Sequence, residues 1–188
     1  MYQSDFIVSL KDGLKAQIRL LKPEDKDEIA EGFQKLSSRA KRFRFFSPIA
    51  RLLPDQLSYL TEIDNIHHLA YGARDISSPE TPGIGISRYV QLKGEKNTAE
   101  FAVTILDEYQ NRGLGRLFIR SLQEAALHHG IRILRGYIHK ENIPMLHLAE
   151  KLGAEFSQTS SLLVRADLSV CQDLNPQSPK KLFNTKMT

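Results

Sequence analysis

The amino-acid sequence predicts a single domain of mixed α/β (α+β) class, in which helices cover both faces of a central mixed β-sheet. Segments of alternating apolar and polar residues, typical of half-buried strands, recur between segments whose apolar residues have helical spacing. Near the middle of the chain, one strand pattern leads through a short polar segment into a glycine-containing turn and an amphipathic helix pattern. The chain has 188 residues, of which 41% are hydrophobic and 26% charged, and these values are typical of one globular domain.

Composition and charge argue against several classes of protein. No apolar run approaches the roughly 20 residues needed to cross a bilayer, and the N-terminus does not resemble a signal peptide, so we expect a cytoplasmic protein with no membrane partner. The net charge of +4 is spread along the chain, which favours a solvated surface over a nucleic-acid surface. The single cysteine, Cys171, forms no intrachain disulfide, and neither a metal site nor a cysteine nucleophile is expected.

The first elements are a predicted hairpin and a helix. Residues 6–14 and 15–21 read as two short strands around Asp12-Gly13, a dipeptide that is favoured in two-residue hairpin turns. A helix then begins at Pro23, since proline and the acidic residues after it suit a first turn. We expect this helix to lie over the sheet through apolar residues at helical spacing, namely Ile29, Phe33 and Leu36.

The next segment, residues 37–48, is the most basic and aromatic part of the chain. Basic residues between aromatics can bind single-stranded nucleic acid by stacking. A short helix that buries Phe43 and Phe46, with Arg42 and Arg44 facing water, requires no ligand. We favour the helix.

The chain continues with a short helix, two strands and a loop. Residues 54–61 have Leu57 and Leu60 at helical spacing, and the two strands are expected at residues 67–74 and 84–92 with a loop at residues 77–83 between them. His67 and His68 are adjacent in the first strand, so they point to opposite faces and cannot bind one metal ion together. We therefore interpret both as structural residues.

Residues 98–106 have the pattern of the central strand. Phe101, Val103 and Ile105 share one face of this strand, and Glu100 lies on the opposite face among small residues. A carboxylate at this position is either a solvated surface charge or a catalytic base. The residues alone favour the solvated charge.

The segment after the central strand, residues 110–115, has the pattern of a phosphate-binding turn. Gly113 and Gly115 remove side chains that would keep a phosphate away, so backbone N–H groups at the following helix start can point at an anion. A plain turn explains such a short match about as well. A dinucleotide fingerprint does not fit, because Phe118 stands at the position of its third glycine.

The remaining elements complete the domain. An amphipathic helix spans residues 114–129, a strand follows at 131–138, Asn142 caps a further helix that ends at Gly153, and two strands follow at 155–158 and 161–168. The first of these helices has Leu114, Leu117, Phe118, Leu122 and Ala125 on its apolar face and Arg116, Arg120, Gln123 and Glu124 opposite. We expect one domain at residues 1–168 and a flexible tail at 169–188.

Three motifs resemble the GNAT superfamily of N-acetyltransferases, over most of residues 16–168. The segment Q-x-x-G-x-G at Gln110, between a strand and a helix, resembles motif A, which holds the pyrophosphate of acetyl-CoA. Residues 37–48 more loosely resemble a stretch in the GNAT domain of bacterial Pat-like protein lysine acetyltransferases. Asn142 with the Lys151-Leu152-Gly153 segment resembles a late GNAT motif, but Ala149 stands at the position of the tyrosine that protonates the leaving thiolate.

The resemblance implies a GNAT-type fold and an N-acetyltransferase with acetyl-CoA as cosubstrate and no metal. It makes Glu100 the expected general base and implies these acetyl-CoA-binding residues: Val103, Thr104, Ile105, Gln110, Asn111, Arg112, Gly113, Leu114, Gly115, Arg116 and Asn142. A protein lysine is slightly favoured over a small amine as acceptor, and either cation could be attracted by Glu62, Asp64, Asp75 and Glu80. The alternatives are a non-catalytic CoA-binding sensor and an RNA-associated protein.

Overall fold

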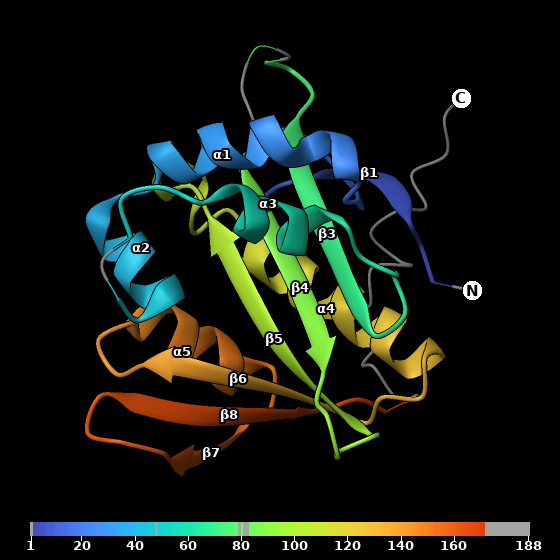
Figure 1. The fold of residues 1–188 in the computed structure, drawn as a ribbon, viewed down its shortest axis with the longest axis vertical. Helices are drawn as coiled ribbons and strands as arrows, with labels where there is room; N and C mark the ends of the chain where they lie inside the picture. Colours follow the sequence, from blue (N-terminus) through green and yellow to red (C-terminus); the bar gives the residue numbers. More distant parts are fainter. Residues whose placement is uncertain (1, 48, 79, 81–82, 172–188) are drawn as a thin grey trace.

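The computed structural model describes residues 2–47, 49–78, 80 and 83–171. One eight-stranded sheet has the order β1-β2-β3-β4-β5-β6-β8-β7, and only the β5–β6 pair is parallel. Helices α1, α2 and α3 lie on one face of the sheet and α4 lies on the other (Figure 1). The predicted mixed α/β fold is therefore confirmed.

Every predicted helix and strand is present, with bounds shifted by a few residues. The strands are β1 (Asp5–Ser9), β2 (Lys15–Leu20), β3 (His68–Asp75), β4 (Gly85–Gln91), β5 (Thr98–Ile105), β6 (Ile133–His139), β7 (Glu155–Gln158) and β8 (Leu163–Ser169). The helices are α1 (Lys26–Lys35), α2 (Ser38–Phe45), α3 (Pro54–Thr61), α4 (Leu114–His128) and α5 (Ile143–Lys151), with short 3-10 turns η1 (Pro23–Asp25) and η2 (Asp107–Tyr109).

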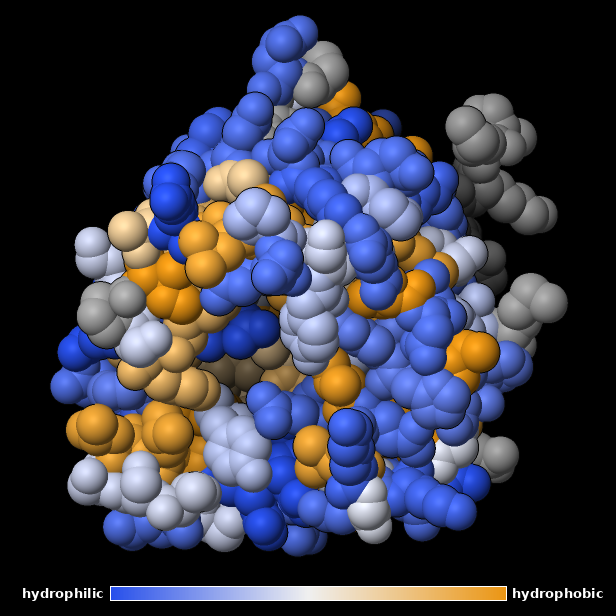
Figure 2. Space-filling model, in the orientation of Figure 1, coloured by the Kyte–Doolittle hydropathy of each residue, from blue (hydrophilic) through white to orange (hydrophobic). Residues whose placement is uncertain are grey.

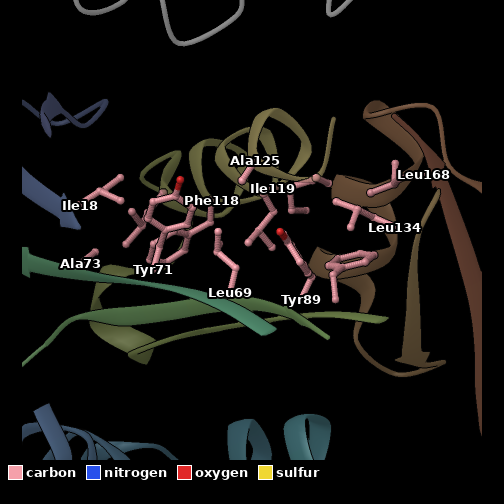
Figure 3. Packing of buried hydrophobic residues seen from close by; sticks show 14 of the residues in the cluster. Ile18, Leu69, Tyr71, Ala73, Tyr89, Phe118, Ile119, Ala125, Leu134 and Leu168 are labelled. Carbon is pink, nitrogen blue, oxygen red and sulfur yellow. The ribbon is translucent and has the colours of Figure 1, made fainter. Parts of the chain in front are cut away.

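The main hydrophobic core lies between the sheet and α4 (Figure 3). Tyr71 and Tyr89 from the sheet and Phe118 and Leu122 from α4 are fully buried there. The hydroxyl groups of both tyrosines have partners, since Tyr71 donates to the carbonyl of Gln3 at 2.9 Å and Tyr89 donates to that of Ile66 at 3.0 Å. This core fixes the position of α4, and with it the position of the turn that precedes α4.

The parallel strands β5 and β6 separate along their length. Their pairing extends only from Thr98 opposite Ile133 to Glu100 opposite Arg135. Beyond this point β5 remains paired with β4 and β6 with β8, so the strands diverge towards their C-terminal ends. Gly136 lies at the point of divergence, where an added Cβ would lie 2.7 Å from the ring of Phe101.

The predicted hairpin is present, but its turn is longer than expected. Residues 10–14 connect β1 to β2, and Gly13 has a left-handed φ of +86°. The backbone N–H of Leu10 donates to the carbonyl of Leu14 at 2.8 Å, and that of Gly13 donates to the carbonyl of Leu10 at 3.0 Å. The prediction of a two-residue turn was wrong because these bonds close a wider loop around Asp12-Gly13.

The expected orientation of α2 was also wrong. Phe46 caps the helix in a left-handed conformation and is 45% exposed, whereas Phe45 packs against Phe33 at a ring-centroid distance of 5.6 Å. Arg42 faces solvent as expected, but Arg44 is partly buried against the sheet side of the helix. An eight-residue helix with five basic or polar residues has too weak an apolar pattern to set its rotation.

The C-terminal part of the fold adds two details. Gln123, expected on the polar side of α4, is 1% exposed, because its side-chain amide donates to the carbonyl of Ser169 at 3.2 Å. Strand β8 extends to Ser169, and Val170 is buried in the core. The predicted tail from residue 172 onward, and residues 79, 81 and 82 of the predicted loop, lie outside the described residues.

Candidate active site

A cavity of about 750 Å³ opens where β5 and β6 diverge. Helices α2 and α5 and the turn before α4 complete its walls. Figure 2 shows that this face is hollowed beside α2, with hydrophobic surface along the rim and hydrophilic side chains inside. Most of the predicted site residues line it, namely Glu100, Val103, Thr104, Ile105, Gln110, Asn111, Gly113, Gly115, Arg116 and Asn142.

The turn before α4 has the backbone geometry of an anion cradle. Asn111 and Gly113 have left-handed φ angles of 62° and 96°, and Gly113 is the N-cap of α4. The first backbone N–H groups of any α-helix have no intrahelical partner, and at the start of α4 no side chain caps them. These N–H groups and the positive end of the α4 dipole make this end of the helix suited to a phosphate.

Gly115 has a packing role in this turn. A Cβ at this position would lie 3.0 Å from Cδ2 of Leu148 in α5 and 3.5 Å from Cδ1 of Ile105 in β5. The glycine therefore lets α4 approach both elements closely.

Two predicted residues, Arg112 and Leu114, do not line the cavity with the others. The guanidinium of Arg112 donates to Asp12 at 2.6 Å and to the carbonyl of Glu108 at 2.7 Å, so its charge links the turn to the β1–β2 hairpin. Leu114 is 1% exposed and belongs to the core under the sheet. Only the backbone of these residues remains available to a ligand.

The hairpin brings a residue that the sequence did not indicate. The backbone N–H of Lys11 donates to the carbonyl of Arg112 at 3.1 Å, and the Lys11 side chain lines the cavity next to Gly113. Lys11 is far from Arg112 in the sequence, so no local motif includes it. Only the fold places its ammonium group beside the anion cradle.

The free edge of β5 lines the cavity above the turn. Beyond Glu100, backbone groups of β5 that point away from β4 have no partner on β6. The side-chain amide of Gln110 donates to the carbonyl of Ile105 at 3.1 Å and so holds the turn against the end of the strand. The N–H of Leu106 donates to the carbonyl of Ile84 on the β4 side at 3.0 Å, and N–H directions alternate along a strand. The backbone N–H groups of Val103 and Ile105 are therefore placed to donate to a ligand along this edge, whereas that of Thr104 points to β4.

Glu100 lies at the last paired position of β5 and β6, and its side chain is exposed to the cavity. It shares one face of the sheet with Arg88, because Val90 is opposite Glu100 and Arg88 is opposite Ala102 in the β4–β5 register. This face lies under α1, α2 and α3 (Figure 1). Phe101 is in the core on the opposite face, and the alternation in the sequence predicted this separation of Glu100 from Phe101.

Helix α5 closes the far side of the cavity. Asn142 is its N-cap, with the side-chain oxygen accepting from the backbone N–H of Met145 at 3.3 Å. Ala149 is fully buried against β6 and β8, which leaves no hydroxyl at the position of the family's tyrosine. Among the side chains that line the cavity, Tyr137 on β6 and His147 on α5 can donate a proton.

A smaller cavity of about 90 Å³ lies between the sheet and helix α1. Arg44 lines both this cavity and the larger one, so the two share a wall at α2. Arg88, which is 5% exposed, forms part of the floor and contacts Nε2 of His68 at 3.0 Å. Burial, then the charge of Arg88, lowers the pKa of His68 to about 4, so its neutral imidazole accepts this bond.

The acidic residues expected to attract a cationic acceptor already have partners, with one exception. Glu62 pairs with Lys26, and Asp75 is buried and accepts from the backbone N–H of Ser77 at 2.9 Å. Asp64 accepts hydrogen bonds from backbone N–H groups at the start of β3 and also pairs with His67. Burial alone would raise the pKa of Asp64, but these hydrogen bonds outweigh it and lower the pKa. Glu80 is exposed and forms no ion pair with any other described residue.

Within the residues that the structure describes, no group of three or more His, Cys, Asp or Glu side chains could hold a metal ion. None of the described helices is long and apolar enough to cross a membrane. His67 and His68 have the structural partners described above.

Comparisons with known proteins agree with this geometry. A family model described as an acetyltransferase (GNAT) domain matches residues 16–155. An acetyltransferase of Pseudomonas aeruginosa is 33% identical over 148 residues, which cover 79% of each chain. The GNAT domain of S. lividans PAT has a TM-score of 0.81 at 21% identity and covers 88% of this chain and 96% of its own. Spermidine N-acetyltransferase from Vibrio cholerae, solved with CoA and spermine, has a TM-score of 0.66 at 18% identity, and the match covers 85% of this chain and 98% of that protein. The chain therefore belongs to the GNAT family of acetyltransferases.

Proposed function

We propose that the protein transfers the acetyl group of acetyl-CoA to a primary amine. The observation that carries this proposal is the single cavity that joins the anion cradle before α4, the free edge of β5 and the carboxylate of Glu100. Each of the three supplies one requirement of the reaction: cosubstrate binding, carbonyl polarisation and removal of a proton from the amine.

Binding of acetyl-CoA would use mainly backbone groups. The N–H groups of the turn from Gln110 to Arg116 would donate to the pyrophosphate, helped by the α4 dipole and by the ammonium group of Lys11. The free edge of β5 from Val103 to Ile105 would donate to the amide-rich arm, which reaches towards Asn142 on the opposite wall. The relative solved with CoA supports the choice of ligand class.

Transfer would proceed by direct attack in a ternary complex, with acetyl-CoA supplying an activated thioester. Glu100 would accept a proton from the ammonium form of the acceptor, directly or through a water. A backbone N–H of β5 would donate to the thioester oxygen as charge develops there. The new N–C bond forms as the C–S bond breaks, and the thiolate finally takes up a proton.

The proton donor for the thiolate differs from the family pattern because Ala149 carries no hydroxyl. Tyr137 and His147 line the same cavity, and we propose that one of them, or solvent, takes this role. The late motif assigns neither role, since Tyr137 precedes it and His147 lies at a position that it leaves open.

Two acceptor classes agree with this chemistry. Similarity to the GNAT domain of a Pat protein supports the protein lysine favoured from the sequence, and an open cavity of about 750 Å³ admits a side chain from outside. Similarity to a spermidine acetyltransferase supports a small amine. Incubation with acetyl-CoA and separated lysate fractions tests the choice, because acetyl groups found only on small molecules would contradict a protein acceptor.

The alternative function is a sensor that binds CoA without turnover, which the absence of the tyrosine at Ala149 favours. The two functions differ in one measurement. Release of free thiol from acetyl-CoA that depends on added amine supports the enzyme, whereas tight CoA binding without amine-dependent thiol release supports the sensor.

A further inference from the structure

Among the described residues, two of the four arginines that line the smaller cavity form no ion pair. The carboxylates among its lining residues are Asp25 and Glu28, and each already forms a two-bonded pair with an arginine. Arg19 donates to Asp25 at 2.7 and 2.8 Å, and Arg74 donates to Glu28 at 2.6 and 3.1 Å. The two other arginines of the lining, Arg44 and Arg88, are left without a carboxylate of the cavity.

Arg44 is the more accessible of these two arginines. In the part of the chain that the structure describes, its guanidinium has no hydrogen bond or ion pair, and its Cζ lies 5.1 Å from the centroid of the Phe45 ring. Burial lowers the pKa of Arg44, and the negative charge of Glu100 acts in the opposite direction. Because Arg44 lines both cavities, its charge is presented to a molecule that enters from the site of Glu100.

Arg88 lies deeper and has only neutral partners. Its guanidinium contacts Nε2 of His68 at 3.0 Å and donates to the carbonyl of Leu60 at 3.2 Å. Burial, then the positive charge of Arg44, lowers the pKa of Arg88 to about 9. Two cations that repel each other in an enclosed space are costly in free energy unless an anion binds between them.

We propose that Arg44 and Arg88 bind an anionic group of the acceptor, so that the substrate is a small primary amine that also carries a carboxylate or a phosphate-type group. This proposal rests on the proposed function and selects within it, because a polyamine would be repelled here. A cavity of about 90 Å³ admits a carboxylate or phosphate but not a folded protein segment.

The sheet also suggests the size of the acceptor. Arg88 and Glu100 are diagonal neighbours across the β4–β5 pair, and such residues are about 7–8 Å apart. An amine at Glu100 and an anion at the arginines are therefore separated by a short carbon chain. ω-Amino acids of three to six carbons have this form, although the proposal requires only the two charged ends.

The test compares matched acceptors of equal length. Acetyl transfer is measured for ω-amino acids, for an aminoalkylphosphonate, for alkylamines and for diamines. We expect kcat/KM for the anionic amines to exceed that for the other two classes by about tenfold or more. The ratio of carboxylate to phosphonate identifies the anion. Alkylamines or diamines used as well as anionic amines at every length would overturn the proposal.

Variants of Arg44 test whether this arginine causes the preference for anionic amines. Arg44→Gln should raise KM for the anionic amines by about 10- to 100-fold and leave alkylamines nearly unchanged. Arg42→Gln, on the exposed side of the same helix, is the control. Arg44→Glu should reverse the preference towards diamines, which a misfolded variant cannot do. An unchanged preference in Arg44→Glu would contradict the proposal.

A binding measurement separates this proposal from the proposed function. Calorimetry of the CoA complex with an N-acetylated ω-amino acid and with the matching N-alkylacetamide requires no turnover. If no amine or protein lysine is ever acetylated, the proposed function fails, and tighter binding of the anionic probe would still support the anion site. Equal binding of both probes, with turnover present, would overturn the anion site alone.

Discussion

Glu100 carries a negative charge beside a cavity whose inner wall carries the positive charge of Arg44. The position of Glu100 could be predicted from the sequence, because strand alternation places it on the face opposite Phe101, and the family resemblance gives it a role. The position of Arg44 could not be predicted, since the weak apolar pattern of α2 left the rotation of that helix undetermined. The unpaired charge of Arg44 becomes apparent only when its neighbours on β4 and α1 are known.

Glu100→Gln should keep the affinity for acetyl-CoA and lower kcat by about 100-fold or more, because the amide keeps the shape of the side chain but accepts no proton. The deficit should shrink at high pH, where the amine loses its proton without help. Calorimetry and steady-state kinetics measure the two quantities. Glu155→Gln, on the exposed strand β7, is the control. Equal losses of binding and turnover would make Glu100 a structural residue.

His68 should make stability depend on pH. Its pKa is about 4 in the folded protein, below the ordinary 6.5, so the unfolded chain binds more protons between these values. The free energy of unfolding should therefore fall as pH drops from 6.5 towards 4, by up to about 1.4 kcal/mol per pH unit. His68→Gln should remove this slope, and the exposed His147→Gln should keep it, in urea titrations at several pH values. If the free energy of unfolding depended on pH in the same way for all three proteins, His68 would not be the source of the slope.

At the scale of elements, the site is made where three of them meet: the turn before α4, the diverging edge of β5 and the tip of the β1–β2 hairpin. The turn and the strand could be predicted because their signals are local, a glycine pattern and an alternation. The docked hairpin could not, since the Arg112–Asp12 pair joins residues that are distant in sequence. The divergence of β5 and β6 could not be predicted either, because it depends on pairing between strands that are distant in sequence.

Gly113→Val should abolish or strongly weaken acetyl-CoA binding. Gly113 has a φ of +96°, and a β-branched side chain resists this conformation and would place its Cβ 3.6 Å from Cγ of Lys11, where it crowds the side chain beside the cradle. Gly130→Val at the other end of α4, with a φ of +77° and open space around it, carries similar backbone strain far from the cavity. Calorimetry on both folded variants decides: if they bind acetyl-CoA equally well, the cradle has no role in binding.

At the scale of the whole molecule, the main core between the sheet and α4 holds the site in place. The sequence predicted this arrangement well, because each strand and helix has a consistent apolar pattern and the motifs mark their order. It did not predict that α1, α2 and α3 enclose a charged cavity on the opposite face, since ion pairs such as Arg19–Asp25 depend on packing between elements.

Phe118→Ala tests the role of this core. The side chain is fully buried, and its removal should lower the free energy of unfolding by about 3–5 kcal/mol in a urea titration. Phe156→Ala, at a 44% exposed position on β7, should change it by about 0.5 kcal/mol or less. Similar effects of the two substitutions would show that the described core does not carry the stability of the fold.

The central claim is that this GNAT family member moves an acetyl group from acetyl-CoA to a primary amine at Glu100. Mass spectrometry of reactions that contain acetyl-CoA, the purified protein and a panel of amines and protein lysines measures this transfer directly. The account predicts an acetylated amine formed together with an equal amount of free CoA, at a rate that falls by about 100-fold in Glu100→Gln. Binding of acetyl-CoA without acetylation of any amine above the uncatalysed background would contradict it.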